Sequence, residues 1–248
     1  MKIDEHIETL DAAGRSLADA AAEAGTDAEV ATCPGWRVRD LLRHTTMVHR
    51  WATAFVAESH TSYHPDGGEP DLDGEELLAH FREGHTLLVA TLRAAPDTVE
   101  CWTFLPAPSP LAFWARRQAH ETTVHRADAE SALPSGLPGP VDPVVAVDGI
   151  DELLRAFHGR DRSRVRTPEP KTLRIRATDT GDVWTVRLSQ EAPRTARDAT
   201  GPADCELSGP ADRLYLTLWN RLPEGAVTVE GDASLARLWR ETSGITWS

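Results

Sequence analysis

One helix of this chain is predicted to carry a carboxylate and an imidazole on its inward face, which constrains the fold more than any other feature. Glu121 and His125 lie four residues apart and therefore fall on one stripe of a helix, since successive residues turn by about 100°. The same stripe carries Trp114 and Asp128. The opposite face carries Arg116, Thr123, Arg126 and Glu130. Charged groups that face a core are destabilising unless they are paired or bind a cation, so this stripe requires a partner.

A divalent cation is one partner that would satisfy both groups. A Glu and a His one turn apart present an oxygen and a nitrogen toward the same point, which suits zinc or a similar divalent ion. A third ligand must come from another element, and the helix predicted over residues 38–56 offers His44 and His49. Periodicity alone does not choose between them. The alternative is an ion pair within the helix or a satisfied polar network in the core.

The other polar residues of these helices have less specific roles. His120 and His125 bracket a run that superficially resembles the helical zinc-protease motif, but they are five residues apart. That spacing turns them about 140° from one another, which excludes a metalloprotease of this type. Arg117 and Asp128 are candidates for supporting the ligands. The remaining helical histidines are expected at helix surfaces, and these are His49, His80, His85 and His120.

Charge and cysteine content exclude several classes of protein. The 248 residues carry a formal net charge of −13 and no basic run interleaved with aromatics, so a nucleic-acid partner is not expected. The N-terminus lacks the apolar run of a signal peptide, and no stretch is long and apolar enough to span a membrane, so we expect a cytoplasmic protein without a membrane partner. The three cysteines are widely spaced and are expected to be reduced and buried: Cys33, Cys101 and Cys205.

The first half of the chain is predicted to be a four-helix bundle. Apolar residues recur at helical intervals in residues 3–24, 38–56 and 77–92. Ser109 and Pro110 supply an N-cap and a first-turn proline for the fourth helix. A turn is expected at Cys-Pro-Gly-Trp, and a loop over residues 60–73. Four long helices joined by short connections indicate a bundle.

The second half is predicted to be a smaller α+β unit. The Pro- and Gly-rich residues 133–140 are the best linker, which gives a domain of residues 1–140 and a second of 141–248. A helix is expected over residues 143–157, followed by a hairpin that turns at Asp-Thr-Gly-Asp. The last predicted elements are a strand at 203–208, a helix at 211–220, a strand at 226–230 and a helix at 233–241.

Two runs of the sequence resemble the mycothiol-dependent maleylpyruvate isomerase family of the DinB-like superfamily. Residues 33–44 read Cys-Pro-Gly-Trp-Arg-Val-Arg-Asp-Leu-Leu-Arg-His, and residues 121–128 read Glu-Thr-Thr-Val-His-Arg-Ala-Asp. Residues 218–232, from Leu-Trp-Asn-Arg to Val-Glu-Gly-Asp, resemble the family's sterol-carrier-like second domain. The resemblance covers most of the chain. It implies a DinB-like bundle that holds a divalent metal, usually zinc, followed by a sterol-carrier-like domain.

The resemblance also implies roles for individual residues. The metal ligands become His44, Glu121 and His125. Arg221 matches an arginine that is expected to reach the interdomain cleft and to bind the carboxylate of substrate or thiol, so it is a catalytic and cosubstrate-binding candidate. Trp36 is expected to anchor the core and is a second candidate for contact with the bound thiol.

These expectations lead to one functional hypothesis and two alternatives. A divalent metal lowers the pKa of a bound thiol, so a metal-bound thiolate could attack a small electrophile. Because no cysteine belongs to the expected ligand set, the sulfur would come from a cosubstrate, which in the resembled family is mycothiol. We expect a monomeric or homodimeric mycothiol-dependent transferase or isomerase. The alternatives are a metal-dependent hydrolase that activates water and a non-catalytic protein that binds a small molecule or confers resistance.

Overall fold

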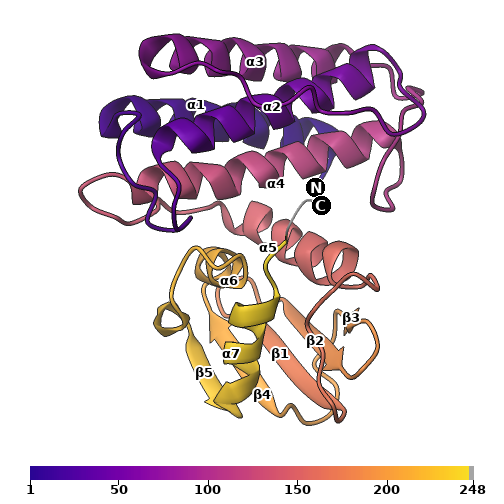
Figure 1. Ribbon diagram of the computed structural model, residues 1–248. Coiled ribbons are helices and arrows are strands. Elements are labelled where there is room, and N and C mark those ends of the chain that lie inside the picture. Colours follow the sequence, from indigo (N-terminus) through magenta and orange to yellow (C-terminus); the bar gives the residue numbers. More distant parts are fainter. Residues whose placement is uncertain (246–248) are drawn as a thin grey trace. The chain divides into compact units, whose positions relative to one another are not determined.

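The computed structural model describes residues 1–245 and divides into two compact units, Met1–Gly139 and Pro140–Ser248. The first unit consists of α1 (Ile3–Ala24), α2 (Val38–Ala57), α3 (Gly74–Ala94) and α4 (Pro110–Ser131). These four helices lie side by side (Figure 1). α1 packs most extensively on α4, and α2 on α3. The predicted bundle is therefore confirmed, and the residues predicted for each helix fall within it.

Local signals explain where the helices begin. The hydroxyl of Ser109 accepts a hydrogen bond from the backbone N–H of Ala112, and Pro110 occupies the first turn of α4, as the sequence predicts. Before α2 the chain turns at Cys33–Trp36, where Trp36 N donates to Cys33 O at 2.9 Å. Gly35 has a φ of 88°, which a residue with a Cβ adopts only with strain, so the turn needs glycine there.

The bundle core has an aliphatic part and an aromatic part. The aliphatic part packs residues of all four helices, among them Leu17, Leu42, Leu77, Phe81 and Ala129. In the aromatic part, the ring of Phe55 stacks on Trp114 at 5.1 Å and on Trp102 at 5.3 Å. These contacts fix α2 against α4 and so help to set the position of His44, which precedes Phe55 on α2, relative to Glu121 and His125, which follow Trp114 on α4.

α4 differs from the amphipathic helix that its periodicity suggests. Every residue from Pro110 to Ser131 is buried or half-buried, and Thr123, predicted on the outer face, is 2 % exposed. Its hydroxyl donates to the carbonyl of Ala119 one turn earlier. Because a threonine can satisfy its own helix backbone in this way, it tolerates burial that the sequence pattern does not reveal.

The second unit is built on a five-stranded sheet with the order β3-β2-β1-β4-β5. The strands are β1 (Lys171–Ala177), β2 (Val183–Leu188), β3 (Arg194–Ala196), β4 (Cys205–Gly209) and β5 (Thr228–Gly231). β1 pairs antiparallel with β2, which confirms the predicted hairpin, and parallel with β4. β3 is an additional edge strand that the sequence analysis does not predict.

Helices complete the α+β unit. α6 (Ala211–Leu218) packs on β1 and β4, and α7 (Ala233–Thr242) packs on β4 and β5. The helix predicted over residues 143–157 is α5 (Pro143–Asp151) continued by a π-helical segment, Glu152–Phe157. Within residues 1–245, no helix is long and apolar enough to cross a membrane. The predicted fold class, a four-helix bundle followed by a smaller α+β unit, is confirmed.

Candidate metal centre

Three side chains from α2 and α4 converge at one point of the bundle. Nε2 of His44 lies 3.7 Å from Oε1 of Glu121, and Nε2 of His125 lies 3.2 Å from the same oxygen. The three residues can offer ligand atoms that all lie within 4.8 Å of one another. Glu121 and His125 are buried, whereas His44 is half-buried.

The separations of these atoms suit a zinc ion. With zinc–ligand bonds of about 2.05 Å and tetrahedral angles, two ligand atoms lie about 3.3 Å apart. The observed separations from Glu121 to the two histidines, 3.2 and 3.7 Å, are close to that value. Two imidazole nitrogens and one carboxylate oxygen are also a donor set typical of catalytic zinc. The residues present therefore fit the divalent metal that the sequence predicts.

Neighbouring side chains hold two of these residues in the orientation that a metal requires. Nδ1–H of His125 donates to Oδ2 of Asp128 at 2.9 Å, which leaves Nε2 directed at Glu121. Arg117 donates from Nη2 to Oε2 of Glu121 at 3.1 Å, which leaves Oε1 directed at the two histidines. A histidine whose second nitrogen is bound to a carboxylate is fixed in both ring orientation and tautomer. Asp128 and Arg117 thus each contact one of the candidate ligands.

The electrostatics of the cluster follow from its burial and from its protein partners. Burial raises the pKa of Glu121, but hydrogen bonds from His125 and His44 and the charge of Arg117 outweigh it and hold this pKa well below its usual value. Burial lowers the pKa of His125, but hydrogen bonds to Asp128 and Glu121 raise it to about 9. Without a cation, an imidazolium therefore supplies the positive charge that the buried carboxylates need.

Trp36 lies next to the cluster. Its ring meets the His44 ring edge to face at 5.3 Å between centroids, and the His44 ring meets His125 at 5.1 Å. Trp36 is half-buried and packs against the aliphatic core. Its position is therefore that of a core anchor beside a proposed ligand.

His49 lies apart from the ligand cluster, although periodicity leaves it open as an alternative to His44. It is fully buried, and its Nε2 is hydrogen bonded to the hydroxyl of Thr122 at 2.9 Å. Its ring packs 5.5 Å from those of Phe81 and His85. Burial, followed by the charge of His85, holds the pKa of His49 well below its usual value, so it is a neutral core residue.

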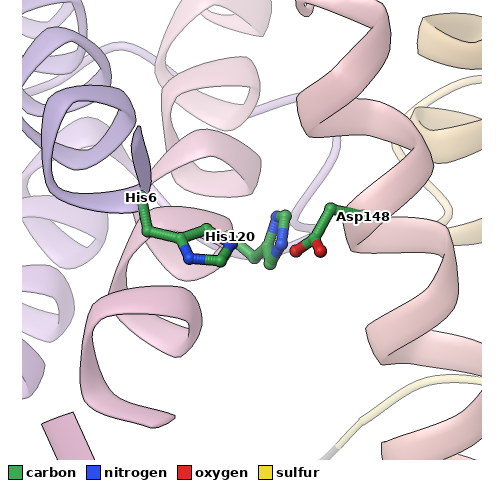
Figure 2. Close-up of side chains that lie close together, drawn as sticks. All are labelled: His6, His120 and Asp148. Atoms are coloured by element: carbon green, nitrogen blue, oxygen red, sulfur yellow. The ribbon is translucent and has the colours of Figure 1, made fainter. Parts of the chain in front are cut away.

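The expectation that the remaining helical histidines lie at the surface is wrong for His49, His85 and His120. These three residues are buried, while His80 is half-buried. His85 reaches the carbonyl of Asp11, and the ring of His120 lies edge to face with His6, 6.0 Å between centroids (Figure 2). Asp148, which the same figure labels, belongs to the second unit. Imidazole rings can be buried where hydroxyls, carbonyls or other rings contact them, and the sequence does not show these partners.

Arg221 follows α6 in the second unit. The chain leaves this helix through Asn220, which adopts a left-handed φ of 62°, and the backbone N–H of Arg221 donates to Leu216 O at 2.7 Å. The guanidinium donates from Nη1 to Trp219 O at 2.8 Å, and the residue is half-buried. The helix end therefore fixes the backbone of Arg221 and one of its guanidinium nitrogens.

The sequence analysis does not predict the two hydroxyl residues near the cluster, Thr32 and Ser131. Thr32 donates to Oδ1 of Asp128 at 2.6 Å and lies 3.1 Å from the hydroxyl of Ser131, which itself donates to the carbonyl of Asp128. Thr32 and Asp128 are 96 positions apart, so neither periodicity nor motif spacing could pair them.

The expected burial is confirmed for two of the three cysteines, and all three are free thiols. Cys33, Cys101 and Cys205 form no disulfide, and Cys101 and Cys205 are buried while Cys33 is half-buried. Burial raises the pKa of both Cys101 and Cys205. These two residues are therefore held as neutral thiols.

Comparisons with known proteins agree with this architecture. The family model for the mycothiol maleylpyruvate isomerase N-terminal domain matches residues 7–130, and that for the MDMPI C-terminal domain matches residues 144–238. No curated protein sequence matches the chain.

Two similar solved structures are crystal structures of the mycothiol-dependent maleylpyruvate isomerase. One of them is a variant in which a histidine is replaced by alanine, with a TM-score of 0.66 and 11 % identity. The other has a TM-score of 0.63 and 12 % identity, and both alignments cover 93 % of each chain. At this identity the likeness shows a shared fold. Because the two family models together span the bundle and the α+β unit, the chain belongs to the mycothiol-dependent maleylpyruvate isomerase family.

Proposed function

We propose that His44, Glu121 and His125 bind one divalent cation, with zinc as the foremost candidate. The observation that carries this proposal is the convergence of two imidazole nitrogens on one carboxylate oxygen, at 3.7 and 3.2 Å. Asp128 and Arg117 occupy the other polar atoms of His125 and Glu121, so the atoms that face one another are the ones available to a metal. Three protein ligands would leave a fourth position for a ligand from outside, which is typical of catalytic zinc.

We further propose that the ligand from outside is the thiol of mycothiol. When bound, the cation would hold this thiol as a thiolate at neutral pH, which is the nucleophile needed for attack on a small electrophile. The family models support mycothiol as the cosubstrate. The chain's own buried cysteines favour an external thiol, since burial raises the pKa of Cys101 and Cys205 and keeps both protonated.

The proposed activity is that of a cytoplasmic S-transferase or isomerase. Addition of the thiolate to an activated alkene, followed by bond rotation and elimination, gives cis–trans isomerisation, whereas addition alone gives an S-conjugate. Glu121 would help to balance the charge of the cation, and Arg117 and Asp128 would keep Glu121 and His125 in place. We assign Arg221, in the proposed second domain of residues 141–248, the binding of a carboxylate on the thiol or substrate, because a guanidinium binds carboxylates with directed, charge-assisted hydrogen bonds.

Titration of the zinc-loaded protein with mycothiol tests this proposal. Binding should release close to one proton per site at pH 7, because a thiol that binds as a thiolate loses its proton. Cobalt in place of zinc should give a sulfur-to-metal charge-transfer band when mycothiol is added. A zinc-loaded protein that binds no mycothiol at millimolar concentration and releases no proton would contradict the thiol mechanism. Hydrolysis without sulfur in the product would then indicate activated water, and absence of turnover would indicate a binding protein.

The role of Arg221 has its own test in the same titration. Arg221→Ala should weaken mycothiol or substrate affinity about 10- to 100-fold, as expected for the loss of a charge-assisted hydrogen bond. The zinc content should stay unchanged. Arg237→Ala removes an exposed arginine from α7 and serves as the control. Equal affinities in both variants and the parent would remove Arg221 from the site.

A further inference from the structure

Asp128 is the point at which the loop before α2 meets the proposed metal site. Its carboxylate is completely buried, and its two oxygens contact different donors: Oδ2 accepts from His125 Nδ1 at 2.9 Å, and Oδ1 accepts from Thr32 at 2.6 Å. A buried carboxylate is tolerated only where hydrogen bonds replace its water, so both donors matter for where it points. The Thr32 bond is the shorter of the two and comes from outside α4.

The loop that carries Thr32 is itself well defined. Glu29 and Arg37 form an antiparallel bridge across it, and Val30 N donates to Trp36 O at 2.9 Å. Its residue Val30 belongs to the aliphatic core of the bundle, and the half-buried Cys33 and Trp36 pack against that core. The loop therefore stays in place without the Thr32 hydroxyl, and this hydroxyl acts on Asp128 from a rigid support.

We propose that Thr32 is a positioning residue of the metal site, which fixes the carboxylate of Asp128 and through it the ring of His125. The loop thereby acts on two of the three proposed ligands, since Trp36 contacts the ring of His44 and Thr32 reaches His125 through Asp128. With Asp128 held at Oδ1, its other oxygen keeps the proton of His125 on Nδ1 and leaves Nε2 directed at Glu121 Oε1. This inference rests on the proposed metal site. It adds a residue that neither helix periodicity nor the ligand motif contains.

The zinc affinity of Thr32 variants, measured by competition with a chelator, tests the proposal. Thr32→Val keeps the shape of the side chain and removes the hydroxyl, and it should weaken zinc binding about 10- to 100-fold, the usual range for loss of a partner of a metal-bound histidine. Thr32→Ser keeps the hydroxyl and should restore parental affinity. Thr53→Val is the matched control, because it makes the same change at a buried hydroxyl that donates to the backbone carbonyl of His49 in its own helix. It should bind zinc as the parent does.

The possible results distinguish a failure of the Thr32 proposal from a failure of the proposed metal site. If the parent binds zinc and Thr32→Val binds it equally well, the positioning role is wrong and the site stands. If the parent binds no zinc, the proposed site fails, and the inference fails with it. A merely structural role would lower the unfolding temperature of the metal-free variant and leave the zinc affinity of the folded protein unchanged.

If Thr32→Val does not fold, a measurement on the parent protein tests the proposal instead. In the zinc-loaded protein, imidazole NMR should show His125 protonated at Nδ1. The hydroxyl proton of Thr32 should exchange slowly enough to be observed, as a 2.6 Å bond to a buried carboxylate requires. Protonation of His125 at Nε2, or a rapidly exchanging Thr32 hydroxyl, would overturn the proposal.

Discussion

Oε1 of Glu121 lies 3.7 Å from Nε2 of His44, on a different helix, and the charge of this carboxylate is central to the proposed cation site. Glu121→Gln keeps the size of the side chain and its place beside Arg117 but removes the negative charge. We expect zinc affinity to fall at least about 100-fold, because an amide oxygen is a much weaker zinc ligand than a carboxylate. Chelator competition measures this loss.

Glu130→Gln is the control for the charge of Glu121, since it makes the same change on the same helix. Glu130 pairs with Arg126 and lies outside the cluster. Parental zinc affinity in Glu121→Gln would show that the carboxylate is not a ligand.

If His44 rather than His49 is the third ligand, variants at these two positions should differ in zinc content. His44→Ala should hold less than about a tenth of an equivalent of zinc after gel filtration, because one of three protein ligands is lost. His49→Gln should retain the parental stoichiometry, since a glutamine can keep the hydrogen bond to Thr122. Elemental analysis decides between them. Full zinc content in His44→Ala would show that another residue completes the site.

Asp128→Asn should weaken zinc binding without abolishing it. The amide keeps the shape of the side chain but accepts the Nδ1–H of His125 less strongly than the carboxylate, whose observed bond is 2.9 Å. We expect a loss of about 10- to 100-fold in affinity, whereas His125→Ala should lose the metal outright. Isothermal titration with zinc distinguishes these sizes of effect. Equal and negligible effects would place both residues outside the site.

Gly14 in α1 is required by the ring of His85. A Cβ at Gly14 would lie 2.2 to 2.6 Å from three ring atoms of this buried imidazole. Gly14→Ala should therefore destabilise the bundle by about 1–3 kcal/mol through overpacking, although alanine is ordinarily the better helix former. Urea unfolding measures the change.

Gly84→Ala is the control for Gly14, because the nearest atoms to its Cβ would be 3.6 and 3.8 Å away on the flexible side chain of Arg50. It should stabilise the helix by roughly 0.5–1 kcal/mol. Combining Gly14→Ala with His85→Ala should recover part of the loss. Destabilisation of the same size in both single glycine variants would refute the role of the His85 ring.

His158 should make the second unit sensitive to acid. Burial, partly opposed by a hydrogen bond to the Ser243 backbone, lowers the pKa of His158 from 6.5 to about 4. The folded state thus binds this proton less tightly than the unfolded state, so the stability is complete above pH 6.5 and declines as the pH falls toward 4. At pH 4.5 the loss should be roughly 2–3 kcal/mol.

The contribution of His158 is measured by urea unfolding at pH 7.5 and 4.5. His158→Gln removes the titrating group and should flatten the pH dependence. His64→Gln, at an exposed position, should leave it unchanged. If His158→Gln loses stability between pH 7.5 and 4.5 as steeply as the parent does, the acid sensitivity does not come from His158.

The elements with strong local signals could be predicted from the sequence. The apolar spacing of α1 to α3, and the Ser109 and Pro110 pair at the start of α4, give helices that the structure confirms. The hairpin follows from its Asp-Thr-Gly-Asp turn between alternating strands. In contrast, Arg194–Ala196 is only three residues long, too short for a periodic pattern, and the π-helical turn at Glu152–Phe157 has no local signature.

Only those site residues that share one helix or belong to one motif could be predicted from the sequence. The spacing of Glu121 and His125 brings them together on α4, whereas the pairing with His44 depends on how α2 is rotated against α4. That rotation is set by packing, including the Phe55 ring against Trp114. The burial of His85 and the bond from Thr32 to Asp128 join segments far apart in the chain, so single-sequence periodicity contains neither.

A crystal of the zinc-replete protein, measured at energies on both sides of the zinc edge, tests the metal site most directly. We predict one anomalous peak per chain within about 2.0–2.2 Å of Nε2 of His44, Oε1 of Glu121 and Nε2 of His125. The anomalous signal should disappear below the zinc edge. Density for the three side chains without a peak among them, or a zinc peak held by other residues, would contradict the account.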